Sequence, residues 1–271
     1  MNLGLISDLH YDTYETITKA DFYENIHQLV TELALDYLVI GGDISNNYAT
    51  TITFVEDLQT IINIPVYFIP GNHDYWEKDI AVKDTQAIYQ QFVKHPQCLM
   101  ESPILLNDHY ALVGHTAWYN YSVHADRFTE AELEKGVYGE RTWQDKRNTD
   151  WGVSDKNLSR QFADLVETDL NRVGDREVVL VTHMVTVPEF TVPMPHESFD
   201  YFNAFIATDD FDTIYQQYPI KYSSMGHIHY RGSFTREGIT YICNCLGYEK
   251  EWRSPNFKEE LRNSLYVIDL A

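Results

Sequence analysis

Residues 66–74 read VYFIPGNHD, an apolar run that gives way abruptly to polar residues. The branched and aromatic side chains of residues 66–69 predict a buried strand. The glycine that follows allows a sharp turn and a close approach of the backbone. An amide, an imidazole and a carboxylate come next, and such groups ligate metals or move protons. This stretch therefore predicts a strand that carries reactive side chains at its carboxyl end.

The same arrangement recurs at four other places in the chain. Short apolar runs predict further strands, and an aspartate or histidine follows each of them. Ligands bind at the carboxyl ends of strands in open α/β sheets, so we expect these side chains to meet at one edge. The runs span residues 3–6, 37–40, 178–182 and 222–225, and the polar residues after them are Asp8, His10, Asp43, His183, His227 and His229.

The rest of the chain alternates between strand-like and amphipathic helical runs, which is typical of layered α/β packing. We find no internal repeat, low-complexity stretch or linker, and we interpret residues 1–271 as a single domain. The predicted helices span residues 21–35, 51–62, 79–93 and 156–171, and the remaining predicted strands span 111–113, 239–244 and 265–269.

The segment from about residue 115 to 153 does not fit this rhythm. A loop of this length is usually functional or disordered, and its content of tryptophan and tyrosine opposes disorder. We interpret it as an insertion packed over one end of the sheet, and we predict that it forms part of a pocket wall. We considered His115, His124 and Trp118 as pocket-lining residues, with a structural or surface role as the alternative for each. We also expect one of its cations to contact substrate, and these are Arg127, Lys135, Arg141, Lys146 and Arg147.

The composition excludes several classes of function. The chain has 41 acidic and 20 basic residues and a net charge of −21, which opposes binding to duplex nucleic acid or anionic membranes. No apolar run reaches the ~18 residues that a membrane helix needs, and we expect a cytoplasmic protein because the N-terminus has no signal-peptide pattern. Three cysteines are too few for a disulfide framework. We expect Cys243 and Cys245 on opposite faces of a strand.

The residue types at the predicted edge suit transition metals. Imidazole and carboxylate together favour Mn, Fe, Zn or Ni. Two ions that share a bridging carboxylate would use all seven candidates, and such sites clamp phosphoryl groups and generate a nucleophile. Each piece alone has an ordinary explanation, since an aspartate after a strand often caps a helix. The joint pattern favours a metal site built from Asp8, His10, Asp43, Asn72, His183, His227 and His229.

The order of these motifs resembles the signature of the calcineurin-like metallophosphoesterases. The resemblance runs from residue 8 to residue 229 and so spans nearly the whole chain. It implies a two-sheet β-sandwich flanked by helices, with the metals at one end. The motifs that carry it are Asp8-x-His10, Gly42-Asp43, Gly71-Asn72-His73-Asp74, His183 and Gly226-His227-x-His229.

The resemblance also implies a role for each residue. Asp8, His10 and His229 would hold one metal ion. Asn72, His183 and His227 would hold the other, and Asp43 would bridge the two. A metal-bridging hydroxide would attack phosphorus, Asn72 and His73 would contact the substrate, and His73 would act as general acid with Asp74 orienting it. The implied cofactors are two divalent or trivalent transition-metal ions, with Mn or Fe favoured over Zn or Ni.

Two departures from better-known branches narrow the function. The protein phosphatases carry an arginine soon after the position of Asp43, and the purple acid phosphatases carry a tyrosine where this chain has Asn46. The pattern is closer to the bacterial phosphodiesterase-like branch, so we expect a small phosphodiester or phosphomonoester as substrate. A nuclease of the same superfamily and a non-catalytic scaffold remain alternatives. The net charge opposes the first, and the filled ligand positions oppose the second. The oligomeric state stays open.

Overall fold

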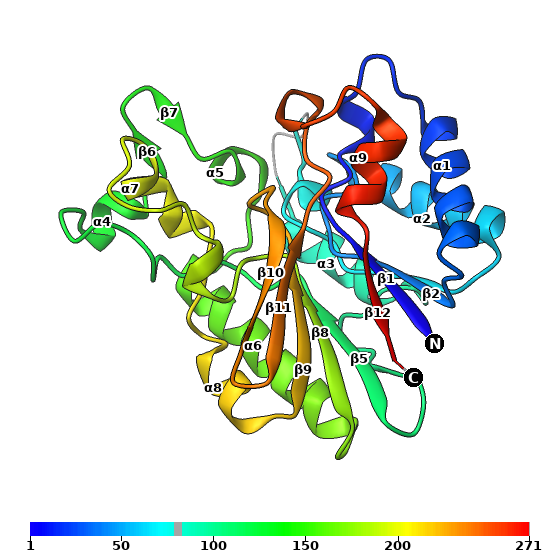
Figure 1. Cartoon of the computed structure of the whole chain (residues 1–271). Coiled ribbons are helices and arrows are strands. Elements are labelled where there is room, and N and C mark those ends of the chain that lie inside the picture. The colour runs from blue at the N-terminus through cyan, green and yellow to red at the C-terminus, as the bar shows by residue number, and fades with distance from the viewer. Residues whose placement is uncertain (79–82, 271) are drawn as a thin grey trace.

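Two sheets form the centre of the molecule in the computed structural model, which describes residues 1–78 and 83–270 (Figure 1). The four-stranded sheet has the order β12-β1-β2-β3, and the six-stranded sheet has the order β10-β11-β9-β8-β5-β4. The first contains β1 (Asn2–Ile6), β2 (Tyr37–Ile40), β3 (Val66–Phe68) and β12 (Tyr266–Asp269). The second contains β4 (Ile104–Leu105), β5 (Tyr110–His115), β8 (Glu177–Thr182), β9 (Ile220–Met225), β10 (Arg231–Arg236) and β11 (Ile239–Asn244). The predicted two-sheet architecture is confirmed.

Helices flank both sheets. Helix α1 packs against α2 and α9 beside the four-stranded sheet, whereas α6 packs against β5 of the other sheet (Figure 1). Thr18 and Asp21 form a capping box at the start of α1, which satisfies backbone N–H groups there. The main helices are α1 (Lys19–Glu32), α2 (Tyr48–Ile62), α3 (Thr85–Val93), α6 (Asp155–Arg172), α8 (Asp212–Gln217) and α9 (Phe257–Ser264).

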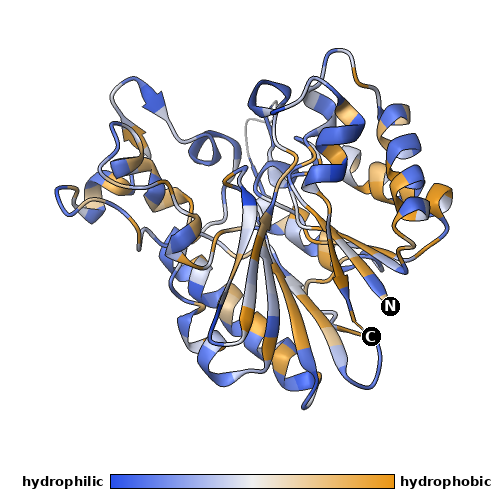
Figure 2. Ribbon diagram, viewed as in Figure 1, coloured by the Kyte–Doolittle hydropathy of each residue, from blue (hydrophilic) through white to orange (hydrophobic). Residues whose placement is uncertain are grey.

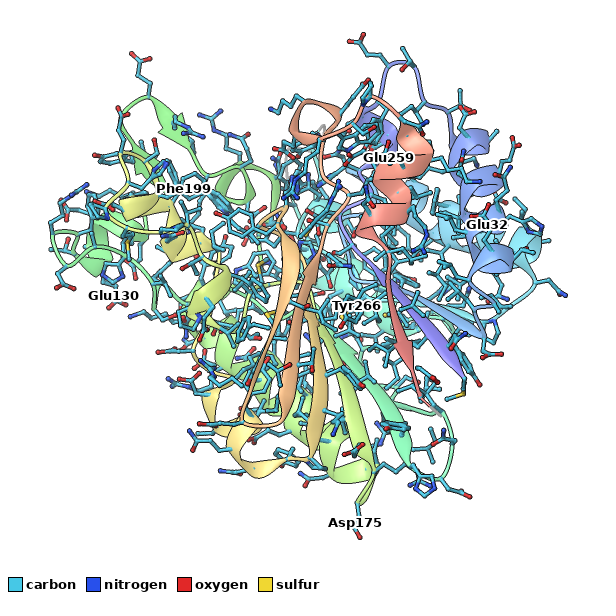
Figure 3. All side chains as sticks on the ribbon, viewed as in Figure 1. Glu32, Glu130, Asp175, Phe199, Glu259 and Tyr266 are labelled. Atoms are coloured by element: carbon cyan, nitrogen blue, oxygen red, sulfur yellow. The ribbon has the colours of Figure 1, made fainter. Side chains whose placement is uncertain are left out.

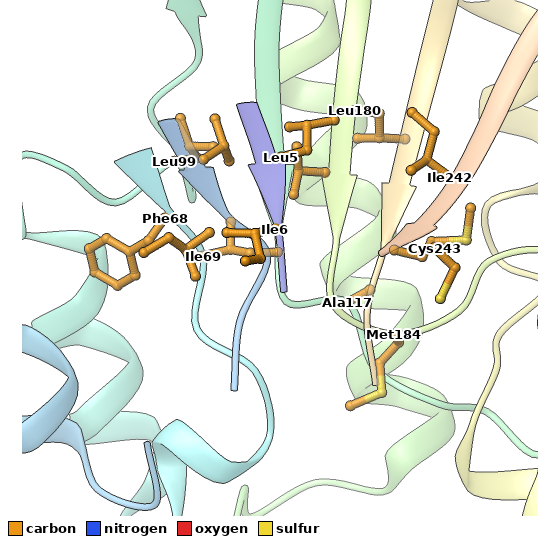
Figure 4. Close-up of a cluster of buried hydrophobic side chains, with 14 of the residues drawn as sticks. Leu5, Ile6, Phe68, Ile69, Leu99, Ala117, Leu180, Met184, Ile242 and Cys243 are labelled. Atoms are coloured by element: carbon orange, nitrogen blue, oxygen red, sulfur yellow. The ribbon is translucent and has the colours of Figure 1, made fainter. Parts of the chain in front are cut away.

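One hydrophobic core spans the two sheets. Figure 2 shows that the strands are mostly apolar and that the outer faces of the helices are polar. In Figure 4, Leu5 and Ile6 of the first sheet lie near Leu180 of the second, and all three are buried. Each such side chain contributes about 1.5–3 kcal/mol on burial. The core therefore holds the strands, and with them the strand ends, in a fixed arrangement.

The pairing of the strands brings their carboxyl ends to one edge. β1, β2 and β3 are parallel, and so are β5, β8, β9 and β11. Beyond the ends of β1 and β11, Ser7 and Cys245 form an isolated parallel bridge. The two sheets therefore converge where the polar motifs follow the strands.

The insertion forms a lobe beyond this edge (Figure 1). It contains α4 (Glu130–Leu133), β6 (Val137–Tyr138), β7 (Arg141–Thr142) and α5 (Asp145–Asn148). Helix α7 (Phe199–Phe202) belongs to the same lobe, which the sequence did not predict because α7 lies in a different part of the chain. Glu130 and Phe199 mark the lobe in Figure 3.

The structure also bears on the predicted helix at residues 79–93, on the two neighbouring cysteines and on membrane-spanning helices. Helix α3 begins at Thr85, and residues 79–82, which we predicted to be helical, lie outside the described residues. The expectation for the cysteines was wrong: the Sγ atoms of Cys243 and Cys245 lie 3.8 Å apart. Residues two apart in a strand share a face. Within residues 1–78 and 83–270, no helix is long and apolar enough to cross a membrane.

Candidate active site

The predicted ligands follow the strands, and most of them have an unusual backbone conformation. L-residues seldom adopt positive φ angles, and such residues persist where the surrounding structure holds them. The left-handed residues redirect the chain within four residues of the ends of β1, β2 and β9. Five of the predicted ligands have this conformation, namely Asp8 (φ 56°), His10 (φ 42°), Asp43 (φ 51°), His227 (φ 71°) and His229 (φ 56°).

Two glycines make the close packing around Asp43 possible. A Cβ atom at Gly71 would lie 2.2 Å from the Asp43 Oδ1 atom, which is far inside contact distance. Gly42 has a φ of +97°, and a Cβ atom there would lie 2.6 Å from the His183 Nδ1 atom. Neither position accepts a side chain without displacing a candidate ligand.

The first cluster consists of Asp8, His10 and His229, whose ligand atoms lie within 4.8 Å of one another. The His229 Nδ1 atom lies 2.7 Å from the Glu251 Oε2 atom. A carboxylate accepts, so Nδ1 carries the proton and a neutral ring leaves Nε2 bare. That Nε2 atom lies 3.4 Å from Asp8 Oδ1 and 3.1 Å from His10 Nε2.

The second cluster consists of Asp43, His183 and His227. His183 donates from Nδ1 to the Gly41 carbonyl at 2.9 Å, and its Nε2 atom lies 3.4 Å from Asp43 Oδ1. His227 donates from Nε2 to the Phe205 carbonyl at 3.0 Å, which leaves its Nδ1 atom for the cluster. Asn72 joins this group, since its Oδ1 atom lies 3.1 Å from His183 Nε2.

Asp43 lies between the two clusters. Its carboxylate also groups with His10 and His73 within 4.8 Å, so it faces histidines of both sets. Burial alone would raise the pKa of Asp43, but His183, His73 and His10 lower it well below its ordinary value. Among the described residues, the ion-pair partners of Asp8 and Asp43 are histidines rather than lysine or arginine.

The histidines respond to these charges in opposite ways. Burial lowers the pKa of His10 and of His227 to about 4. Burial also disfavours the charged form of His183, but Asp43 outweighs it and raises the pKa to about 9. Likewise, Asp8 and Glu251 outweigh burial and raise the pKa of His229 to about 10. A proton on each of these two rings would balance a buried carboxylate, and a metal ion would displace it.

The donor set therefore fits transition-metal ions. Two buried carboxylates, one amide oxygen and several imidazole nitrogens converge, and acceptors outside the clusters fix the proton on three of the rings. Such outer contacts are typical of histidines that bind metal. The His10 Nδ1 atom is buried with no hydrogen-bond partner among the described residues.

His73 stands beside Asp43, with its Nε2 atom 3.9 Å from Asp43 Oδ2. Its Nδ1 atom lies 2.8 Å from the Asn46 Oδ1 atom. The Asn46 amide nitrogen donates to the Asp12 carboxylate at 3.1 Å, so its oxygen must face the histidine. His73 therefore donates from Nδ1 and directs Nε2 toward the clusters. Burial lowers its pKa well below the ordinary value, although Asp43 opposes that shift.

The expectation that Asp74 orients His73 needs correction. The buried Asp74 carboxylate accepts hydrogen bonds from the backbone N–H of Gly71 at 2.8 Å and of Ser45 at 3.0 Å, and from the hydroxyl of Thr51 at 2.5 Å. Burial and the charge of Asp43 raise the pKa of Asp74 to about 7. Asp74 thus ties the two loops that carry Asp43 and Asn72 together, and Asn46 takes the place beside His73.

A pocket of about 500 Å³ opens above the clusters. The insertion contributes residues 140–145 and Arg147 to its wall, as predicted. Trp76 lines it too, stacked on His73 at a centroid distance of 3.6 Å. Other lining residues come from segments that the sequence did not single out or left open, namely Phe199, Phe202 and Tyr248.

Three other candidates, His115, His124 and Trp118, do not line this pocket. His115 is buried against Tyr89, with its Nε2 atom 3.1 Å from the tyrosine hydroxyl, and Trp118 is buried and donates to Asp155 at 2.7 Å. No sequence motif marks Asn46 as a hydrogen-bond partner of His73 or Glu251 as a partner of His229, because both contacts form only in the folded chain.

Solved structures of other proteins have a similar fold. A solved structure described as the phosphopantetheinyl hydrolase PptH from Mycobacterium tuberculosis has a TM-score of 0.75 and 17% identity, and the match covers 100% of this chain and 96% of that one. A dimetal phosphatase from Danio rerio has a TM-score of 0.54 and 14% identity, covering 90% of this chain and 86% of that one. These similarities show a shared fold.

Sequence comparisons identify the family. An uncharacterised protein of Acanthamoeba polyphaga mimivirus, L509, is 22% identical over 270 residues, with 92% of each chain covered. The model of the calcineurin-like phosphoesterases matches residues 1–231, which include every predicted ligand. This chain therefore belongs to the calcineurin-like phosphoesterase family and is a metal-dependent hydrolase of phosphate esters.

Proposed function

We propose that the chain hydrolyses small phosphodiesters or phosphomonoesters at a centre of two transition-metal ions, with Mn or Fe favoured. Asp8, His10 and His229 are the proposed ligands of one ion. Those of the other are Asn72, His183 and His227, and Asp43 is shared. One observation carries the proposal: His183 and His229 each give one ring N–H to an outside acceptor and hold the other nitrogen 3.4 Å from a buried carboxylate oxygen.

The chain supplies charge balance and a proton donor. When bound, the two ions would neutralise phosphoryl oxygens and make a water nucleophilic near neutral pH. The proposed task of Asp43 is to hold both ions at a fixed separation, since its carboxylate faces both clusters. Asn72 and His73 follow one another in the chain, so a phosphate held near Asn72 would also lie beside His73.

His73 is the proposed general acid. Its Nδ1–H is held by Asn46, which leaves Nε2 as the atom that delivers a proton to the leaving oxygen. Burial favours the neutral ring, but the negative charge of a bound phosphate would favour the protonated one. An acid must be protonated to act, so its contribution falls as pH rises through the pKa of His73 in the complex.

The pocket favours a small substrate with an apolar part. Trp76, Trp143 and Tyr248 offer aromatic faces above the clusters. Arg141 and Arg147 line the same pocket and are the proposed contacts for anionic oxygens, in the role predicted for one cation of the insertion. The name of the mycobacterial structure adds one candidate, an extended phosphopantetheinyl ester, which the same aromatic walls would accommodate.

The nuclease alternative fits the charge distribution poorly. Much of the acidity lies on the surface, as Glu32, Glu130 and Asp175 illustrate at the periphery in Figure 3. A net charge of −21 repels a long polyanion, whereas metal ions attract a small ester at short range.

The experiment is turnover of bis(p-nitrophenyl) phosphate, p-nitrophenyl phosphate, a phosphopantetheinyl ester and duplex DNA by the purified chain with Mn²⁺. We expect hydrolysis of small esters, loss of activity on chelation, and negligible cleavage of DNA at physiological salt. Efficient DNA degradation that disappears in Asp43→Asn would contradict the proposal and favour the nuclease.

A further inference from the structure

Asp145 is a buried carboxylate in the insertion, at the start of α5, and its side chain is 1% exposed. Its Oδ1 atom accepts from the Asn72 amide nitrogen at 2.9 Å and from the Trp76 indole at 2.7 Å. Its Oδ2 atom accepts from the Trp143 indole at 2.8 Å. Three neutral N–H groups therefore satisfy this carboxylate at a place where a buried charge is costly.

Each of the three donors leads to a different part of the proposed site. Asn72 turns its amide nitrogen to Asp145, so its oxygen faces His183 Nε2 at 3.1 Å. Trp76 stacks on His73, with ring centroids 3.6 Å apart and an interplanar angle of 29°. Trp143 lies edge-on to His227, with centroids 5.8 Å apart.

We propose that Asp145 is a positioning residue that ties the insertion to the second metal cluster and to His73. The proposal rests on the proposed function, because it takes Asn72 as a metal ligand. An amide binds metal through its oxygen, and its nitrogen has no free lone pair to offer. By accepting from the Asn72 nitrogen, Asp145 selects the orientation that presents the oxygen to the cluster. By holding Trp76, it fixes the surface against which His73 stacks.

This role differs from that of an ordinary buried polar residue. A carboxylate that only stabilises the lobe would affect the melting temperature and would leave the relative affinity of the two metal sites unchanged. A residue that orients Asn72 acts selectively on the cluster of Asp43, His183 and His227. The cluster of Asp8, His10 and His229 has its own outer partner in Glu251 and should be spared.

The decisive variant is Asp145→Ala in the full chain. It removes both carboxylate oxygens, whereas asparagine could keep one oxygen on Asn72 and Trp76 and lose only the contact with Trp143. We expect the affinity for one of two Mn²⁺ ions to fall by about 10- to 100-fold, the range typical for partners of metal ligands. Calorimetric Mn²⁺ titration and elemental analysis measure this directly, and near-ultraviolet circular dichroism verifies folding. Asp126→Ala, which removes an exposed carboxylate of the same insertion, should bind both ions as the wild type does.

If Asp145→Ala does not fold, Trp76→Phe tests the link between Asp145 and His73. It keeps a ring over His73 but removes the N–H group that binds Asp145. We expect a larger loss of turnover with an alkyl leaving group, which needs a proton, than with p-nitrophenolate. Equal losses for the two leaving groups would overturn the link between Asp145 and His73.

Two results separate this inference from the proposed function. A folded Asp145→Ala protein that binds both Mn²⁺ ions with wild-type affinity would refute the role of Asp145 alone. A wild-type chain that binds no Mn²⁺ and hydrolyses no phosphate ester would refute the proposed function and this inference with it.

Discussion

The strand ends and the insertion build the same pocket by different physical means. At the strand ends, β-ladders and left-handed residues such as Asp43 and His227 fix each side chain within four residues of a buried sheet. In the insertion, β6, β7 and α5 are two to four residues long, and side chains such as Asp145 anchor them. We therefore propose that the residues at the strand ends carry out the chemistry and that the loops above them select the substrate.

The largest effect on turnover is expected from a substitution at the strand ends, at His73. His73→Ala should keep its fold and metal content and lose about 10²- to 10⁴-fold in turnover of an alkyl ester, as expected for a general acid. The loss should shrink for p-nitrophenolate, which leaves without a proton. The variant should also lack the decline of kcat at high pH that deprotonation of His73 causes.

Parallel assays of the two leaving groups across the pH range measure this. An equal loss for both would mean that His73 stabilises charge in the transition state and transfers no proton.

A smaller effect is expected at Glu251, which lies beyond residues 1–231 of the family match. Glu251→Ala would leave the Nδ1–H group of His229 without its acceptor, so the ring would lose its fixed proton and orientation. We expect about 10- to 100-fold weaker binding of one metal ion. Glu249→Ala, on the same short turn, is the matched control. Unchanged Mn²⁺ affinity in Glu251→Ala would show that the backbone alone positions His229.

The smallest effect is expected on the insertion side. Arg141→Gln or Arg147→Gln should raise KM about fivefold, the factor for an exposed contact worth about 1 kcal/mol, with kcat and metal content unchanged. The effect should weaken as salt is added, because exposed charges are screened. Lys135→Gln, an exposed cation of the same insertion, is the control. A drop in kcat without a change in KM would mean that these arginines act in the chemical step. That result would contradict the proposed division of roles between the strand ends and the insertion.

The same contrast explains what the sequence could predict. The strands at residues 37–40 and 239–244 have the predicted bounds, since each is an apolar run with polar residues or turns beside it. The candidate ligands could be found because each follows such a run within four residues. The fold and the cluster at the sheet edge were therefore accessible to pattern analysis.

The missed elements lack such a pattern. β10 reads RGSFTR, a mostly polar edge strand that pairs with β11, and α9 is eight residues long with a largely polar sequence. The partners of the site residues are equally hidden. Asn46 is 27 residues from His73, and Asp145 is 73 residues from Asn72. These contacts depend on tertiary packing. From the sequence alone we expected Asp74, the neighbour of His73 in the chain, to orient His73, whereas Asn46 is its hydrogen-bond partner in the structure.

The shared role of Asp43 is tested most directly by the number of Mn²⁺ ions bound per chain in the wild type, in Asp43→Asn and in His10→Ala. We predict two ions in the wild type, weakened binding at both sites in Asp43→Asn, and loss at mainly one site in His10→Ala, because one carboxylate would serve both ions. Retention of two tightly bound ions by a folded Asp43→Asn protein would contradict the shared role of Asp43.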